Sequence, residues 1–153
     1  MAEQEYLFIN RVCHLDTRLT LSRLEEEFAK ALMECKILGA RCKGCHRILI
    51  PPRVVCNKCE DEVEETLLDQ GSTGIVQSAI KLEYKITDCS TAKPKPTPYP
   101  YATIELEGGG RVDGFLNVDD LSKVKVGQKV RPLWKPKEER IGHLTDIVYW
   151  EII

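Results

Sequence analysis

The sequence lacks any hydrophobic run long enough to span a bilayer, and it lacks a secretory signal. The opening stretch, MAEQEYLFIN, has acids where a signal peptide needs basic residues, and its apolar run is only four residues long. We therefore expect a cytoplasmic protein with no membrane segment, in a compartment that keeps thiols reduced.

A strong excess of positive charge is also missing. The chain has 22 Lys and Arg against 24 Asp and Glu, which gives a formal net charge of -2. Dedicated nucleic-acid binders are usually strongly basic, so this balance disfavours that class. With 42% hydrophobic and 30% charged residues, the 153-residue chain is globular, with one domain or two small ones.

No catalytic set can be recognised. No cysteine has a histidine in an arrangement that suggests a nucleophile and its base. The glycine triplet Gly108–Gly110 lies between two expected strands and not before a helix, so it is not a phosphate-binding loop. We therefore expect a protein that is not an enzyme.

The chain does have cysteines, seven in all, and the odd number argues against a complete disulfide framework. Four form two Cys-x-x-Cys pairs, ten residues apart, in RCKGCHRILIPPRVVCNKC at residues 41–59. In a reduced compartment this spacing indicates a metal site made by four thiolates, with a short ribbon that turns at Pro51-Pro52. The expected ligands are Cys42, Cys45, Cys56 and Cys59.

The metal is expected to be a structural zinc, because four thiolates leave no open position for a catalytic water. Iron in a rubredoxin-like site would use the same ligands, and the spacing does not separate the two metals. The run Cys42 to His46 also matches a haem attachment motif, but that motif needs no second pair, and Met1 and Met33 are the only methionines available as distal ligands. Gly44 is expected to ease the first turn through a left-handed backbone.

A helix is expected from Ser22 to Leu38, since apolar residues recur there at steps of three or four. Ser22 and Glu25 have the spacing of a capping box, and Gly39 follows as a possible left-handed terminator. The ribbon is too small to cover this helix and a barrel has its own core. Part of the apolar stripe is therefore expected to stay exposed and to dock a partner.

The C-terminal half is expected to form five strands. IVQSAIKLEYK alternates, with Val76, Ile80, Leu82 and Tyr84 on one side, and YATIELE and RVDGFLNV flank the glycine triplet as a hairpin. KVRPLW and LTDIVYWEII supply two more strands, and DDLSKV can form one helical turn before them. Five strands with a short helix after the third is the order of an OB-fold barrel.

The expected fold class is thus α+β, mainly β. It comprises an N-terminal helical segment at 1–39, a zinc ribbon at 40–66 and an OB-fold domain at 67–153. OB-folds often bind single-stranded nucleic acid, which stays the alternative function. The acids Glu105, Glu107 and Asp113 on the central strands would repel phosphates and disfavour it.

Four motifs occur here in one order: GARCKGCHRILIPPRVVCNKC, TGIVQS, PYPYATIELEGGGRVDGFL and VKVGQKVRPLW. Over about residues 20–153 the chain resembles a family long known as a domain of unknown function, the acyl-CoA-associated proteins with a rubredoxin-like zinc ribbon and an OB-fold. His46, Ile50 and Asn57 depart from the family's usual Gly, aromatic and Pro, but none of these positions is a metal ligand.

The resemblance implies a non-catalytic partner of a thiolase or hydroxymethylglutaryl-CoA synthase type enzyme, one that binds or passes acyl-CoA in lipid or isoprenoid metabolism. The family's CoA contacts do not carry over residue by residue. In this sequence Arg47 and Arg53 are candidate contacts for the acyl-CoA phosphates, because they are basic and lie near the turn of the ribbon.

Overall fold

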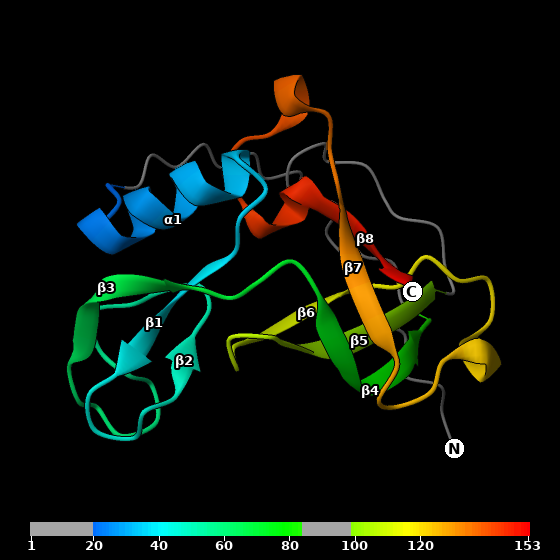
Figure 1. Ribbon diagram of the computed structural model, residues 1–153, viewed down its shortest axis with the longest axis horizontal. Coiled ribbons are helices and arrows are strands. Elements are labelled where there is room, and N and C mark those ends of the chain that lie inside the picture. The colour runs from blue at the N-terminus through cyan, green and yellow to red at the C-terminus, as the bar shows by residue number, and fades with distance from the viewer. Residues whose placement is uncertain (1–19, 84–98) are drawn as a thin grey trace, which may run out of the picture.

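The computed structural model describes residues 20–83 and 99–153, which form one α-helix and two antiparallel sheets (Figure 1). The helix, α1, spans Arg23–Met33. The smaller sheet has the order β2-β1-β3, from β1 (Leu38–Cys42), β2 (Ile48–Leu49) and β3 (Val63–Asp69). In this part of the chain no helix is long and apolar enough to cross a membrane.

The larger sheet has the order β6-β5-β4-β7-β8. Its strands are β4 (Gly74–Leu82), β5 (Tyr99–Leu106), β6 (Arg111–Phe115), β7 (Lys129–Trp134) and β8 (Ile147–Ile152). A parallel bridge from Leu116 to Trp150 joins the end of β6 to β8, and the short helical turn η1 (Leu121–Lys123) lies between β6 and β7. This is the expected OB-fold arrangement, and the mainly β fold class is confirmed.

The helix and the barrel share one hydrophobic core. Phe28 and Leu32 of α1 are buried in the same cluster as Ile104 and Trp150 of the barrel. Leu24, one turn earlier, is also buried, at 6% exposed. The expectation that part of this stripe stays exposed is therefore wrong. The barrel does not close its core alone, and α1 covers part of it.

The start of α1 is as expected, but its end is not. Ser22 Oγ accepts from the Glu25 N–H (3.3 Å), and Glu25 Oε2 accepts from the Ser22 N–H (2.8 Å), which completes the capping box. The helix ends at Met33, five residues before Leu38, because Cys35 takes the left-handed conformation (φ 60°). The N–H groups of Cys35 and Lys36 donate to carbonyls of the last helical turn, as in a Schellman motif.

Strand β4 has an irregularity that the alternation did not predict. Val76 pairs with Ile104, but Ser78 pairs with Thr103, so Gln77 is an extra residue, a β-bulge. Beyond the bulge Ile80 is 54% exposed, although its spacing from Val76 predicts burial, whereas Val76 and Leu82 are buried as predicted. Tyr84 lies outside the described residues.

The chain passes from the small sheet to the barrel between Asp69 and Gly74. Strand β1 begins at Leu38 and strand β3 ends at Asp69, so the small sheet extends a little beyond the expected ribbon at 40–66. The exact domain boundaries, after residues 39 and 66, stay predictions. We call the three-stranded sheet with its cysteine turns, residues 38–69, the ribbon.

Candidate metal centre and adjoining groove

Two turns of the same geometry present the four cysteines. The His46 N–H donates to Cys42 O at 3.1 Å, and the Glu60 N–H donates to Cys56 O at 3.0 Å. His46 and Glu60, each directly after a Cys-x-x-Cys pair, have φ values of 56° and 60°. The left-handed position is therefore the residue after the pair, and the expectation that Gly44 supplies it is wrong.

Gly44 is instead a position of close approach. A Cβ atom there would lie 3.0 Å from Cβ and Cγ of Asp61, across the cluster. Glycine thus lets the first turn pack against the segment that follows the second.

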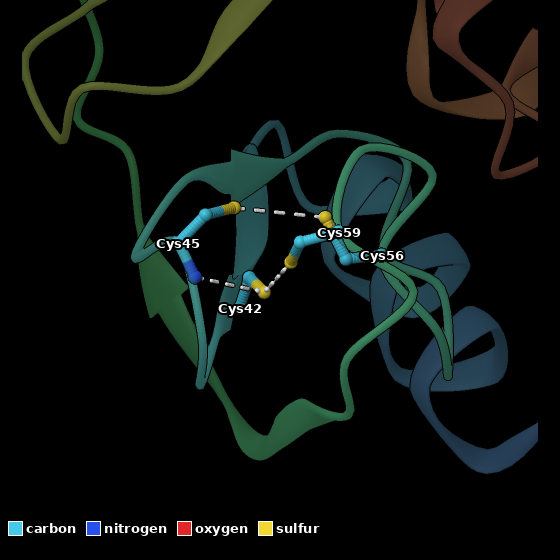
Figure 2. A group of neighbouring side chains, drawn as sticks. All are labelled: Cys42, Cys45, Cys56 and Cys59. Carbon is cyan, nitrogen blue, oxygen red and sulfur yellow. Dashed lines mark hydrogen bonds between the residues drawn. The ribbon is translucent and has the colours of Figure 1, made fainter.

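The four sulfur atoms converge as a metal site requires (Figure 2). Sγ of Cys42 is 3.4 Å from that of Cys59, Sγ of Cys45 is 3.7 Å from that of Cys56, and all four lie within 4.8 Å of one another. A tetrahedral site with metal–sulfur bonds of about 2.3 Å has sulfur atoms about 3.8 Å apart. The cluster therefore has the size to hold one metal ion.

The surroundings of the thiols favour a bound cation. N–H groups of Lys58 and Cys59 donate to the sulfur of Cys56 and lower the pKa of this thiol to about 6. At Cys59 the Asp61 backbone also acts to lower the pKa, but contact with Cys42 and the other thiols outweighs it and raises the pKa to about 11. Four such close sulfurs cannot all be thiolates unless a positive ion compensates their charge.

Burial divides the cluster into an inner and an outer part. Cys42 and Cys56 are buried, Cys45 is half-buried, and Cys59 is exposed. The inner pair packs with Ala40, Leu49 and Val63 in a small core of its own. This core has only five buried hydrophobic residues: Ala40, Cys42, Leu49, Cys56 and Val63. A core of this size contributes little stability, so a bound metal would add much of the stability of the ribbon.

A groove lies between the ribbon and the barrel, in two adjoining parts. The polar part, about 680 Å³, is lined by Arg47, Ile48, Leu49, Ile50, Asn57, Gly109, Arg111 and Asp113. The apolar part, about 370 Å³, shares Ile50, Arg111 and Asp113 with the first. It adds Pro51, Tyr101, Val112, Gly114, Phe115, Leu144, Thr145, Ile147 and Trp150. One wall is thus the ribbon and the other is chiefly β6.

The structure separates the two candidate arginines. Both arginines are exposed, but only Arg47 lines the polar part of the groove. Arg111 lines the same part of the groove, and its Nε and Nη2 donate to Glu105 Oε2 at 3.0 and 2.8 Å. Sequence reasoning missed Arg111 and Asn57, because only the fold brings them next to Arg47.

Comparison with known proteins bears on this architecture. Residues 73–135 match the family described as ChsH2, C-terminal OB-fold domain. A DUF35 domain-containing scaffold protein of Methanocaldococcus jannaschii is 28% identical over 103 residues, which cover 67% of this chain and 70% of the relative. The chain thus resembles ChsH2 in its OB-fold domain and a DUF35 scaffold protein over two thirds of its length.

Two solved structures resemble this chain. The Ltp2-ChsH2(DUF35) aldolase has a TM-score of 0.55 and 22% identity, and the match covers 81% of this chain and 93% of that one. A DUF35 protein of unknown function from Sulfolobus solfataricus has a TM-score of 0.50 and 21% identity, covering 85% and 84%. At these identities the likeness establishes the fold alone.

Proposed function

We propose that this chain belongs to the DUF35 family and is a non-catalytic partner of a thiolase or hydroxymethylglutaryl-CoA synthase type enzyme, and that it binds acyl-CoA in the groove between ribbon and barrel. The groove carries this proposal, because it joins a part lined by arginines to a part lined by aromatic and aliphatic side chains. The names of two similar proteins, one a scaffold protein and one an aldolase with two named components, support a role beside an enzyme.

The two parts of the groove suit the two ends of acyl-CoA. Arg47 and Arg111 offer guanidinium groups, which bind phosphate oxygens through paired hydrogen bonds, and Asn57 adds an amide. Arg111 donates hydrogen bonds to Glu105 through Nε and Nη2, so its Nη1 group can donate to a ligand. At the other end the half-buried side chains of Phe115 and Leu144 offer an apolar surface for an acyl group.

We also propose that Cys42, Cys45, Cys56 and Cys59 hold a structural zinc, with iron as the alternative for the same ligands. The sulfur distances and the need to compensate thiolate charge support a metal here. When bound, the metal supplies cross-linking between the two turns and no chemistry of its own. Arg47 is two residues from Cys45 and Asn57 is next to Cys56, so the metal would also hold the polar wall of the groove in place.

Calorimetric titration with acetyl-CoA tests the ligand, and two arginine variants locate it. Removing a charged hydrogen-bonding group from a phosphate costs about 1.5–3 kcal/mol, or about ten- to a hundredfold in affinity. We expect Arg47→Glu to lose at least tenfold, while Arg53→Glu, with the same charge change outside the groove, stays within about twofold. If the metal-loaded wild type does not bind acetyl-CoA at millimolar concentration, the proposal of acyl-CoA binding is refuted. If Arg47→Glu and Arg53→Glu lose the same affinity, the groove is not the binding site.

The partner is tested by purifying tagged chain from its native host and identifying the proteins that accompany it. A thiolase or synthase supports the proposal. Single-stranded nucleic acid in its place would favour the alternative function.

A further inference from the structure

Gln70 occupies the point at which the chain leaves the ribbon and enters the barrel, and its side chain is fully buried. Nε2 donates to Leu68 O at 2.9 Å, and Oε1 accepts from the Gly110 N–H at 2.9 Å. The side chain therefore bonds the last strand of the ribbon to the turn of the β5–β6 hairpin. Apart from aromatic residues and cysteines, Gln70 and Asp146 are the only buried polar side chains among residues 20–83 and 99–153.

The backbone of Gln70 adds two further bonds between the same parts. Its N–H donates to Ile37 O at 2.9 Å, and its carbonyl accepts from the Gly108 N–H at 3.2 Å. One residue thus joins three segments: the chain before β1, strand β3 and the hairpin turn.

Three glycines make room for the Gln70 amide. A Cβ at Gly108 would lie 2.6 Å from Oε1, one at Gly110 would lie 2.7 Å from Oε1, and one at Gly39 would lie 3.2 Å from Nε2. Within the glycine triplet only Gly109 has a left-handed φ, 84°. Gly109 therefore makes the turn, while Gly108 and Gly110 are small so that the hairpin can approach Gln70.

This joint lies beside the groove. In Figure 1 the turn between β5 and β6 points towards β2 of the ribbon. A Cβ at Gly110 would be 3.1 Å from Cγ2 of Ile48, which lines the polar part. Arg47 belongs to the ribbon and Arg111 directly follows Gly110, so the distance between the two arginines depends on how the ribbon is held against the hairpin.

We propose that Gln70 is a positioning residue that fixes the ribbon against the barrel and thereby sets the separation of Arg47 and Arg111 across the groove. Apolar contact between Ile48 and glycines allows sliding, because it has no preferred direction. A buried amide allows none, since any shift leaves a desolvated donor or acceptor without its partner. The effect on ligand binding rests on the proposed function, whereas the effect on orientation does not.

Residual dipolar couplings of the full, zinc-loaded chain test the orientation directly. In the wild type, amides of the ribbon and of the barrel should fit one alignment tensor. Gln70→Met keeps the length of the side chain but removes both hydrogen bonds, and we expect the two parts to need different tensors. Gln128→Leu is the matched control: its side chain accepts from the Lys125 N–H at 2.6 Å within the barrel, and its loss should leave one tensor.

A single tensor with the wild-type orientation in Gln70→Met would overturn the proposal. If that variant does not fold, Gly108→Ala probes the same joint from the hairpin side, since its methyl group would displace the Gln70 amide, and the same criterion applies. Acetyl-CoA affinity is the second readout: we expect about a tenfold loss in the joint variant with unchanged metal content, and less than twofold in Gln128→Leu.

The two readouts separate the possible failures. Altered tensors with unchanged affinity would overturn the role of Gln70 in the groove and keep its role in orientation. If the wild type does not bind acetyl-CoA, the proposed function fails, and the tensors still decide whether Gln70 fixes the ribbon.

Discussion

At the scale of single residues, substitution of a buried cysteine tests directly whether the four cysteines bind a metal ion. Purified wild type is expected to contain about one zinc per chain, and Cys56→Ser to contain almost none, because the buried sulfur of Cys56 is replaced by an oxygen that stays protonated. Metal analysis and urea unfolding measure this, and we expect the variant to be less stable by several kcal/mol.

Cys35→Ser is the matched control, because Cys35 is a half-buried thiol outside the cluster and its variant should keep the full metal content. Full occupancy in Cys56→Ser would exclude Cys56 as an essential ligand. A red protein whose colour changes when the bound metal is reduced would identify iron in place of zinc.

His46 provides a second test at this scale. Its φ of 56° is a conformation that costs a side chain about 1–2 kcal/mol and costs glycine nothing. We expect His46→Gly to raise the free energy of unfolding by about 0.5–1 kcal/mol in urea titrations with bound zinc, after the greater chain entropy of glycine is counted.

Lys58→Gly serves as the comparison, because Lys58 lies in the second turn without a left-handed φ. That substitution should lower the stability. A loss in His46→Gly as large as the loss in Lys58→Gly would mean that the left-handed backbone at position 46 carries no cost.

At the scale of elements, the sequence predicted what depends on neighbours in the chain. The capping box at Ser22, the hairpin at the glycine triplet and strand β7 are local patterns, and all three are present. The predicted end of α1 and the predicted burial of Ile80 in β4 were wrong, because each depends on contacts distant in sequence. Cys35 replaces glycine as the left-handed residue, and the bulge at Gln77 appears only when β4 pairs with β5.

The same division applies to the site. The spacing of four cysteines within 18 residues predicts a metal site, and the structure brings their sulfur atoms together. The groove could not be predicted in this way, since Arg47 and Arg111 are 64 positions apart. Gln70 is harder still. A glutamine after a strand is usually expected to be exposed to solvent. Only in the structure do the three glycines around its amide show why it is buried.

At the scale of the whole molecule, α1 is part of the barrel's core, and the consequence is that helix and barrel should unfold together. Phe28→Ala removes a side chain that is 6% exposed and packs in the cluster that contains Trp150. Such a truncation costs about 3–5 kcal/mol. For a chain of this length we expect the Tm to fall by about 6–20 °C, in a single transition seen equally by helix circular dichroism and by tryptophan fluorescence.

Met33→Ala is the matched control, because Met33 lies in the same helix but is 44% exposed. Its Tm should stay within about 3 °C of the wild type. The two tryptophans, Trp134 and Trp150, lie in the barrel strands β7 and β8, so their fluorescence reports the barrel and not the helix. If Phe28→Ala lost its helical signal while the tryptophan transition stayed at the wild-type temperature, α1 would be a detachable segment, and docking to a partner would again be the better account of its apolar stripe.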